Sequence, residues 1–143
     1  MIQQVLDGIT HKLREGFGAD ISIYHDALEQ GFKAPCFFVQ MISPAQEQFL
    51  NNRFTRTHVV DVVYFPKEKD PSSEIASVTE KLFFWLKLIP LKDENGNTRA
   101  SRPHAQIVDG VLHFIVNYDM TVYYEETPGD PMNEIEVNQE AES

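Results

Sequence analysis

The sequence predicts an α+β fold in which an antiparallel or mixed sheet of about five strands carries two helices on one face. Two stretches, residues 2–17 and 71–89, repeat apolar residues every three or four positions, as amphipathic helices do. Residues 111–124 instead alternate apolar and polar side chains, which is typical of a strand with one buried face. The turn signal Asp109-Gly110 precedes that run. The predicted element order is α-β-β-β-α-β-β.

The first helix and the first strand are predicted at the N-terminus. Gly16 and Gly18 are expected to end the helix, since glycine is the usual residue just beyond a helix. Ile21 and Ile23 alternate with polar neighbours and predict a short strand over residues 20–24, followed by a polar loop over residues 26–34. The apolar stripe of the helix consists of Ile2, Val5, Leu6, Ile9 and Leu13.

Two further strands are predicted before the second helix. Residues 36–43 are apolar on both faces, so we expect a central, buried strand that Pro44 ends. The β-branched run within residues 53–65 favours a strand over a helix. Its first half is polar, and we therefore expect residues 44–57 to project beyond the core as a hairpin or loop.

The second helix is predicted over residues 71–89. Asp70 can cap it, Pro71 suits its first turn, and Pro90 is expected to end it. A loop is predicted over residues 91–103. The buried stripe of the helix is expected to be Ile75, Val78, Leu82, Trp85, Leu86 and Ile89.

The last strand is predicted to bury its even-numbered side chains against the helices. A slip of one residue would expose the whole apolar set, so the pattern fixes which face is buried. The opposite face carries His113, Asn117, Asp119 and Thr121. The expected buried set is Leu112, Phe114, Val116, Tyr118, Met120, Val122 and Tyr124.

Charge divides the chain into two parts. The net charge is −10, but residues 125–143 hold seven acids and no base, so residues 1–124 carry only about −3. We therefore predict one domain over residues 1–124 and an acidic flexible tail over residues 125–143. Specific DNA binding is not expected without a basic face. A single cysteine, no basic-then-apolar leader and no long apolar run predict a chain from a reducing compartment, without export signal or membrane segment.

No constellation for catalysis, cofactor binding or metal binding emerges from the sequence. The five histidines lack metal-ligand spacing, and neither a phosphate-binding glycine loop nor a serine nucleophile elbow occurs. Cys36 lies in an apolar strand and is expected to be buried and inert. Asp61 could serve as a carboxylate base only inside a pocket, and we expect it to be a surface residue.

Three segments carry a resemblance to a known family. They are EQGFKAPCFFVQMI at 29–42, NNRFTRTHVVDVVYFP at 51–66 and IVDGVLHFIVNYDMTVY at 107–123. In this order and spacing they resemble the small tail terminator proteins of phages and prophages of Gram-positive bacteria, over residues 2–124. The positions that match are Gly31, Phe32, Pro35, Arg53, Asp109, Gly110 and Tyr118.

The resemblance implies a structural virion protein with no catalytic residue and no cofactor. Such proteins form a ring, commonly a hexamer, that ends growth of the tail tube at its head-proximal end. Implied partners are further copies of the chain, the tail tube protein and the head–tail connector or completion protein. DNA would pass through the ring without specific binding, and the protein would reside in the virion tail and, during assembly, in the bacterial host cytoplasm. The residues expected to contact partners are Glu47, Asn52, Arg53, Arg56 and Lys67.

Other interpretations stay open at this point. A small acidic immunity or inhibitor protein would bind a basic partner and would carry its acids on the folded part. A curved-sheet isomerase would need a pocket containing Asp61 or His113. The acidic tail could increase solubility, repel DNA near a channel, or bind a partner through a strand containing Ile135 and Val137.

Overall fold

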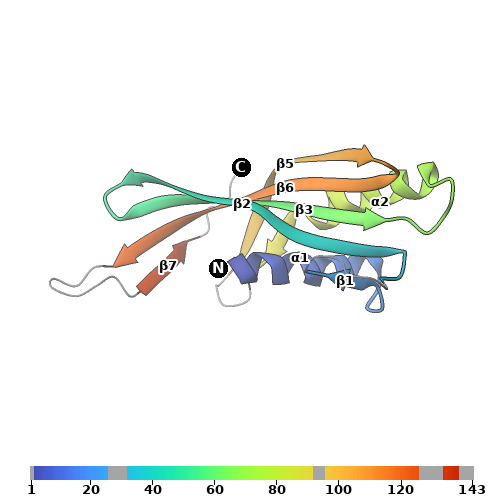
Figure 1. Cartoon of the computed structure of the whole chain (residues 1–143). Helices are drawn as coiled ribbons and strands as arrows, with labels where there is room; N and C mark the ends of the chain where they lie inside the picture. Colours follow the sequence, from blue (N-terminus) through green and yellow to red (C-terminus); the bar gives the residue numbers. More distant parts are fainter. Residues whose placement is uncertain (1, 26–31, 92–95, 126–133, 139–143) are drawn as a thin grey trace.

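The computed structural model describes residues 2–25, 32–91, 96–125 and 134–138, with side chains for all but the last range. Two helices and seven strands alternate along these residues, and the sheet is long and twisted (Figure 1). The helices are α1 (Ile2–Phe17) and α2 (Ser72–Trp85). The strands are β1 (Ser22–Tyr24), β2 (Cys36–Leu50), β3 (Arg53–Phe65), β4 (Leu88–Pro90), β5 (Asn97–Val108), β6 (Val111–Glu125) and β7 (Glu134–Asn138).

The sheet is mixed, as predicted. Six strands follow the order β1-β2-β3-β6-β5-β4, and β7 pairs with the far end of β6. Among the described strands, the β1–β2 pair is parallel and every other pair is antiparallel. The predicted α+β class and the order of its main elements are therefore confirmed. The sequence-based expectation of about five strands omitted the short β4 and β7.

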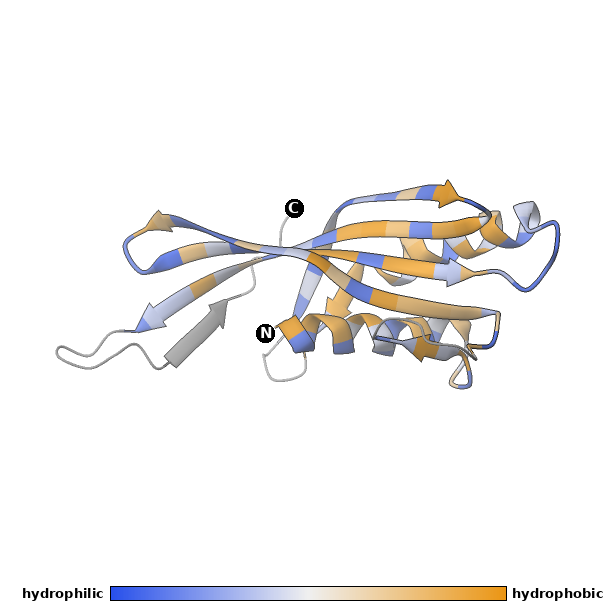
Figure 2. Ribbon diagram, viewed as in Figure 1, coloured by the Kyte–Doolittle hydropathy of each residue, from blue (hydrophilic) through white to orange (hydrophobic). Residues whose placement is uncertain are grey.

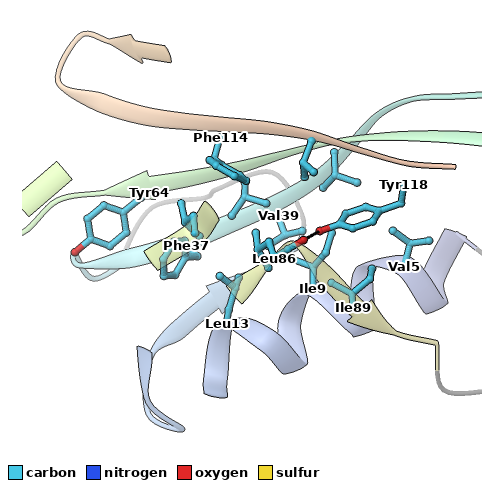
Figure 3. Packing of buried hydrophobic residues seen from close by; sticks show 14 of the residues in the cluster. Val5, Ile9, Leu13, Phe37, Val39, Tyr64, Leu86, Ile89, Phe114 and Tyr118 are labelled. Carbon is cyan, nitrogen blue, oxygen red and sulfur yellow. Dashed lines mark hydrogen bonds between the residues drawn. The ribbon is translucent and has the colours of Figure 1, made fainter. Parts of the chain in front are cut away.

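Both helices pack on one face of the sheet and share one core (Figure 1). Figure 3 shows side chains that α1 and the strands contribute to it. From β6 the core takes the even-numbered side chains from Leu112 to Met120, which are at most 2% exposed. Val122 is buried as well, whereas Tyr124 points to Gln46 and Arg56 instead of the helices. The predicted buried face of the last strand is therefore confirmed up to Val122. The helices contribute Val5, Ile9, Leu13, Ile75, Val78 and Leu82.

The hairpin between β5 and β6 forms at the predicted turn. Asp109 and Gly110 both have positive φ, at 51° and 75°. A two-residue turn with both central residues in the left-handed region matches the right-handed twist of the flanking strands. Glycine at the second position adopts this conformation without a steric penalty.

Pro44 does not end β2, contrary to the prediction. It pairs with His58, and β2 continues to Leu50. On its outer side β2 pairs with β1 only at residues 36–38, so Pro44 lies on an edge. Proline is tolerated in edge strands because one side of such a strand makes no ladder hydrogen bonds.

The prediction for residues 86–103 was also wrong in part. The second helix ends at Trp85, the N-cap is Pro71 without a side-chain cap from Asp70, and β4 follows. The predicted loop over residues 91–103 instead contains the first part of β5, which pairs with β4 and β6. Ile89 is buried all the same. An apolar residue can be buried from a helix or from a strand, so periodicity alone did not separate the two.

Close contact between α1 and β4 depends on Gly8. A Cβ atom at this position would lie 2.4 Å from the Pro90 carbonyl oxygen, too close for any side chain. Glycine in the middle of a helix costs about 1 kcal/mol relative to alanine. In this protein the cost of Gly8 is offset by the close packing of β4 on α1 that the missing side chain allows.

The described part of the predicted acidic tail consists of Glu125, which ends β6, and of β7. The five residues of β7 pair with Thr121–Glu125 of β6. The rest of the predicted tail, residues 126–133 and 139–143, lies outside the described residues, as does most of the loop predicted over 26–34. The division into a domain over 1–124 and a mobile tail stays a prediction.

Candidate protein-interaction surface

A hairpin of β2 and β3 projects beyond the helix-covered part of the sheet (Figure 1). We call residues 43–59 the arm: they comprise the outer part of β2, the turn at 51–52 and the first half of β3. Every residue from Ile42 to Arg53 is exposed. The predicted projection of residues 44–57 is thus confirmed, although it is built from two long paired strands.

The turn of the arm is tied to a third strand. Asn51 has a positive φ of 48°, which asparagine tolerates better than most residues. The Asn52 side-chain amide donates to the Tyr124 carbonyl oxygen at 2.8 Å, and the Tyr124 N–H donates to the Asn52 carbonyl oxygen at 3.0 Å. These two bonds fix the tip of the arm against β6.

A polar cluster crosses the same three strands farther down the arm. The Arg56 guanidinium donates to Gln46 Oε1 through Nε at 2.9 Å and through Nη2 at 2.6 Å. Its Nη2 also lies 2.7 Å from the Tyr124 hydroxyl, which itself donates to Gln46 Oε1 at 3.0 Å. Because a connected network holds each member in place, the arm is a stiff projection and not a free loop.

Aromatic contacts and apolar side chains complete the outer part of the arm. The Arg53 guanidinium carbon lies 4.9 Å from the ring centre of Tyr123, within cation–π range. The Phe54 and Tyr124 rings meet edge-on at 5.2 Å. Phe49 and Leu50 at the tip are 52% and 54% exposed. Figure 2 shows these apolar residues at the end of an otherwise mainly hydrophilic hairpin.

The structure brings together four of the five residues predicted to contact partners. Glu47, Asn52, Arg53 and Arg56 all lie on the arm. Lys67 lies beyond the opposite end of β3, where its main-chain N–H donates to Glu74 Oε2 at 2.8 Å. Arg56 is held inside the arm by the polar cluster, and its predicted role toward an acidic partner stays a prediction.

Sequence reasoning missed the apolar part of this surface. Ile42 is 49% exposed, and it lies with Phe49 and Leu50 on a strand whose other exposed residues are mainly polar. The available signal was the pair Phe49-Leu50 directly before the turn residues Asn51-Asn52. Two large apolar residues beside a turn, outside any core periodicity, point to a surface that a partner covers.

Asp61 is not the surface residue that the sequence predicted. It is 6% exposed and pairs with His113 across the sheet, with Asp61 Oδ2 2.9 Å from His113 Nδ1. Its other carboxylate oxygen is buried without a partner. Neither of two shallow clefts in the described structure, one beside α1 and β4 and one at the base of the arm, includes Asp61 or His113.

Within the described residues, no three His, Cys, Asp or Glu side chains gather closely enough to hold a metal ion. Cys36 is fully buried, as predicted, and burial raises the pKa of its thiol. A group that resists ionisation is a poor nucleophile. The described helices include none with the length and apolar character needed to cross a membrane.

The chain is similar to a known protein family over most of its length. A family model described as "Phage tail terminator protein" matches residues 4–130, which is most of the chain. No curated protein is detectably similar to the sequence.

Proposed function

Since this chain belongs to the phage tail terminator family, a structural and non-enzymatic family of tail assembly, we propose that it closes the tail as a ring. In this proposal six copies assemble at the head-proximal end of the tail. The ring ends growth of the tail tube and offers the surface on which the head or its connector docks. Because the sequence resembles tail terminators of Gram-positive bacteria, the proposal includes a phage or prophage of such a host.

The arm is the observation that carries the proposal. It is stiffened by Arg56 and Asn52, yet it extends beyond the helix-covered part of the sheet and ends in exposed Phe49 and Leu50. Exposed apolar side chains at the tip add little to the stability of a lone chain, because they are only half removed from water. In a ring, each copy can offer such a projection to a different surface of its neighbour, which is the head-to-tail contact that closed rings need.

The charge distribution fits partners other than DNA. Residues 1–124 carry about −3, and the arm holds two arginines and one glutamate. DNA passing through a ring should not bind its wall, because strong phosphate contacts would retard it. Arm contacts with the tail tube protein and with neighbouring copies are therefore proposed, in the virion tail and in the host cytoplasm during assembly.

The immunity-protein alternative gains nothing from the structure. It requires a large excess of acids on the folded part, whereas the 15 acids of residues 1–124 are nearly balanced by 12 bases. Membership of the tail terminator family supports a role in tail assembly and gives no support to an immunity role.

Native mass spectrometry across a wide concentration range, with electron microscopy of tails, tests the proposal. We expect a ring species that grows with concentration, and tails of uncontrolled length when the protein is omitted from assembly. A chain that stays monomeric at every concentration and on purified tail tubes, with normal tail lengths in its absence, would overturn the proposed function.

A further inference from the structure

Two edges of the sheet are open over long stretches. On its outer side β2 pairs with β1 only at residues 36–38, which leaves residues 39–50 without a strand partner in the described structure. At the other end of the sheet, β5 pairs with β4 at residues 97–99, and the Ala100 N–H donates to the Lys87 carbonyl oxygen at 2.9 Å. Residues 101–108 of β5 therefore have no strand partner on their outer side in the described structure. Open edges are usually shortened or covered, because each presents unpaired N–H and C=O groups to other chains.

The directions of the two edge strands are compatible with each other. Three antiparallel steps lead from β2 through β3 and β6 to β5, so β2 and β5 run in opposite directions. A second copy in the same orientation can therefore place its β2 antiparallel to β5 of the first. The contact joins two different edges, so it is head-to-tail and can be repeated around a ring.

The side chains of the two edges are complementary. Glu47 is the single charged residue among 39–50, and it makes no ion pair within the described part of the chain. The β5 edge carries Arg102 and His104, both exposed. Pairing β5 with β5 would bring these basic groups together, whereas pairing β2 with β5 places an acid near them.

Apolar exposure occurs on both edges too. Ile42 on β2 is 49% exposed, and Ile107 and Val108 on β5 are 62% and 49% exposed. Pairing the edges would cover these side chains. Each edge also contains one proline, Pro44 or Pro103. The inner pairing of the β2 edge has two irregularities, and that of the β5 edge has one. Because proline removes a donor, the pairing is confined to a limited register.

We propose that β5 of one copy receives β2 of the next, so that the sheets of neighbouring subunits join edge to edge around the ring. The inference rests on the proposed ring and specifies how its subunits meet. The occupant of each open edge is therefore a second copy of this chain.

Two variants that each block one edge test the proposal. The first combines Ile42→Lys with Glu47→Lys on β2, and the second combines Ile107→Lys with Val108→Lys on β5. All four positions are exposed, so the fold should survive, and circular dichroism checks this. The control, Glu80→Lys with Phe84→Lys, adds the same number of lysines to exposed positions of α2. Native mass spectrometry is recorded for each variant alone and for an equal mixture of the two edge variants.

We expect the wild type and the control to form rings, and each edge variant alone to remain monomeric. Their mixture should give a dimer of one copy of each variant and nothing larger. The first variant keeps an unblocked β5 edge and the second keeps an unblocked β2 edge, so one contact can form per pair. Rings or homodimers of either edge variant would overturn the proposal, as would folded variants that stay monomeric when mixed. If the lysine variants unfold, Ile42→Ser and Ile107→Ser replace them with the same expected outcomes. A wild type that never forms rings would instead overturn the proposed function.

Discussion

The Tyr118 hydroxyl donates a 2.7 Å hydrogen bond to the main-chain carbonyl oxygen of Leu86. It joins the middle of the central strand to the residue that caps the C-terminus of α2 (Figure 3). Tyr118 is fully buried, and burial raises the pKa of its hydroxyl, which therefore stays a donor at any working pH. The bond holds the chain where it leaves α2 and turns into β4.

Removal of this hydroxyl should destabilise the fold. Tyr118→Phe leaves the Leu86 carbonyl buried without that donor, and the expected loss is about 1–3 kcal/mol in the free energy of unfolding. Chemical denaturation measures it. Tyr24→Phe, at a half-buried position on β1, is the control and should change stability by less than about 0.5 kcal/mol. Equal losses in the two variants would contradict the role given to the bond.

Phe114 should be among the costliest positions in the core. It is fully buried and meets the Phe83 ring edge-on at 5.1 Å. Phe114→Ala should reduce stability by about 3–5 kcal/mol because it leaves a cavity. Asn117 lies on the opposite face, where its amide is 2.9 Å from Arg102 Nη2. Asn117→Ala should therefore reduce stability much less than Phe114→Ala. Similar denaturation midpoints for both variants would refute the assignment of faces.

Stability should fall as the pH is lowered from 7 to 5, in part because of His58. Desolvation lowers the pKa of this buried side chain below its ordinary 6.5, despite the hydrogen bond from its Nδ1 to the Tyr118 carbonyl oxygen. The unfolded chain then binds a proton near pH 6.5 that the folded chain resists, so acid favours unfolding. His58→Gln, which cannot titrate, should flatten the plot of unfolding free energy against pH in this window. An unchanged slope would argue against the assignment.

Reversing the charge of Arg53 should impair assembly but not folding. Arg53 is exposed and sits over the Tyr123 ring at the tip of the arm. Arg56→Glu is a poorer test, since it would also break the internal cluster with Gln46 and Tyr124. Arg53→Glu is therefore compared with Lys67→Glu at the far end of β3, by melting temperature and tail length. Normal tails from Arg53→Glu would count against the arm as a contact surface.

Truncation after Glu126 should leave a folded domain. Among the residues whose side chains the structure describes, all members of the buried cluster lie between Val5 and Met120, and we therefore expect the core to form without residues 127–143. The variant should unfold cooperatively, at a somewhat lower temperature because β7 no longer pairs with β6. If assembly is retained and DNA ejection slows, a role of the acidic tail near the channel gains support. Loss of cooperative unfolding would place the domain boundary beyond residue 124.

Local patterns of residues were sufficient to predict several elements of the fold. The helix over 2–17, the strand over 53–65 and the turn at Asp109-Gly110 were predicted at or within a residue of their observed bounds. The buried face of β6 followed from its period of two, since one slipped residue would have exposed the entire apolar set. These features depend on residues that are close together in the sequence, so the sequence alone contains the information needed to predict them.

Features that depend on which strands become neighbours could not be predicted from local patterns and emerged with the folded chain. Pro44 continues β2 because the sheet leaves it on an edge, and residues 88–90 form β4 because Gly8 of α1 and the start of β5 lie beside them. The same holds for the arm. That Arg56 reaches Gln46 and Tyr124, and that Asp61 is buried against His113, follows from the register of β2, β3 and β6. Residues 10 to 78 positions apart in sequence meet there, and no local pattern records which of them will be in contact.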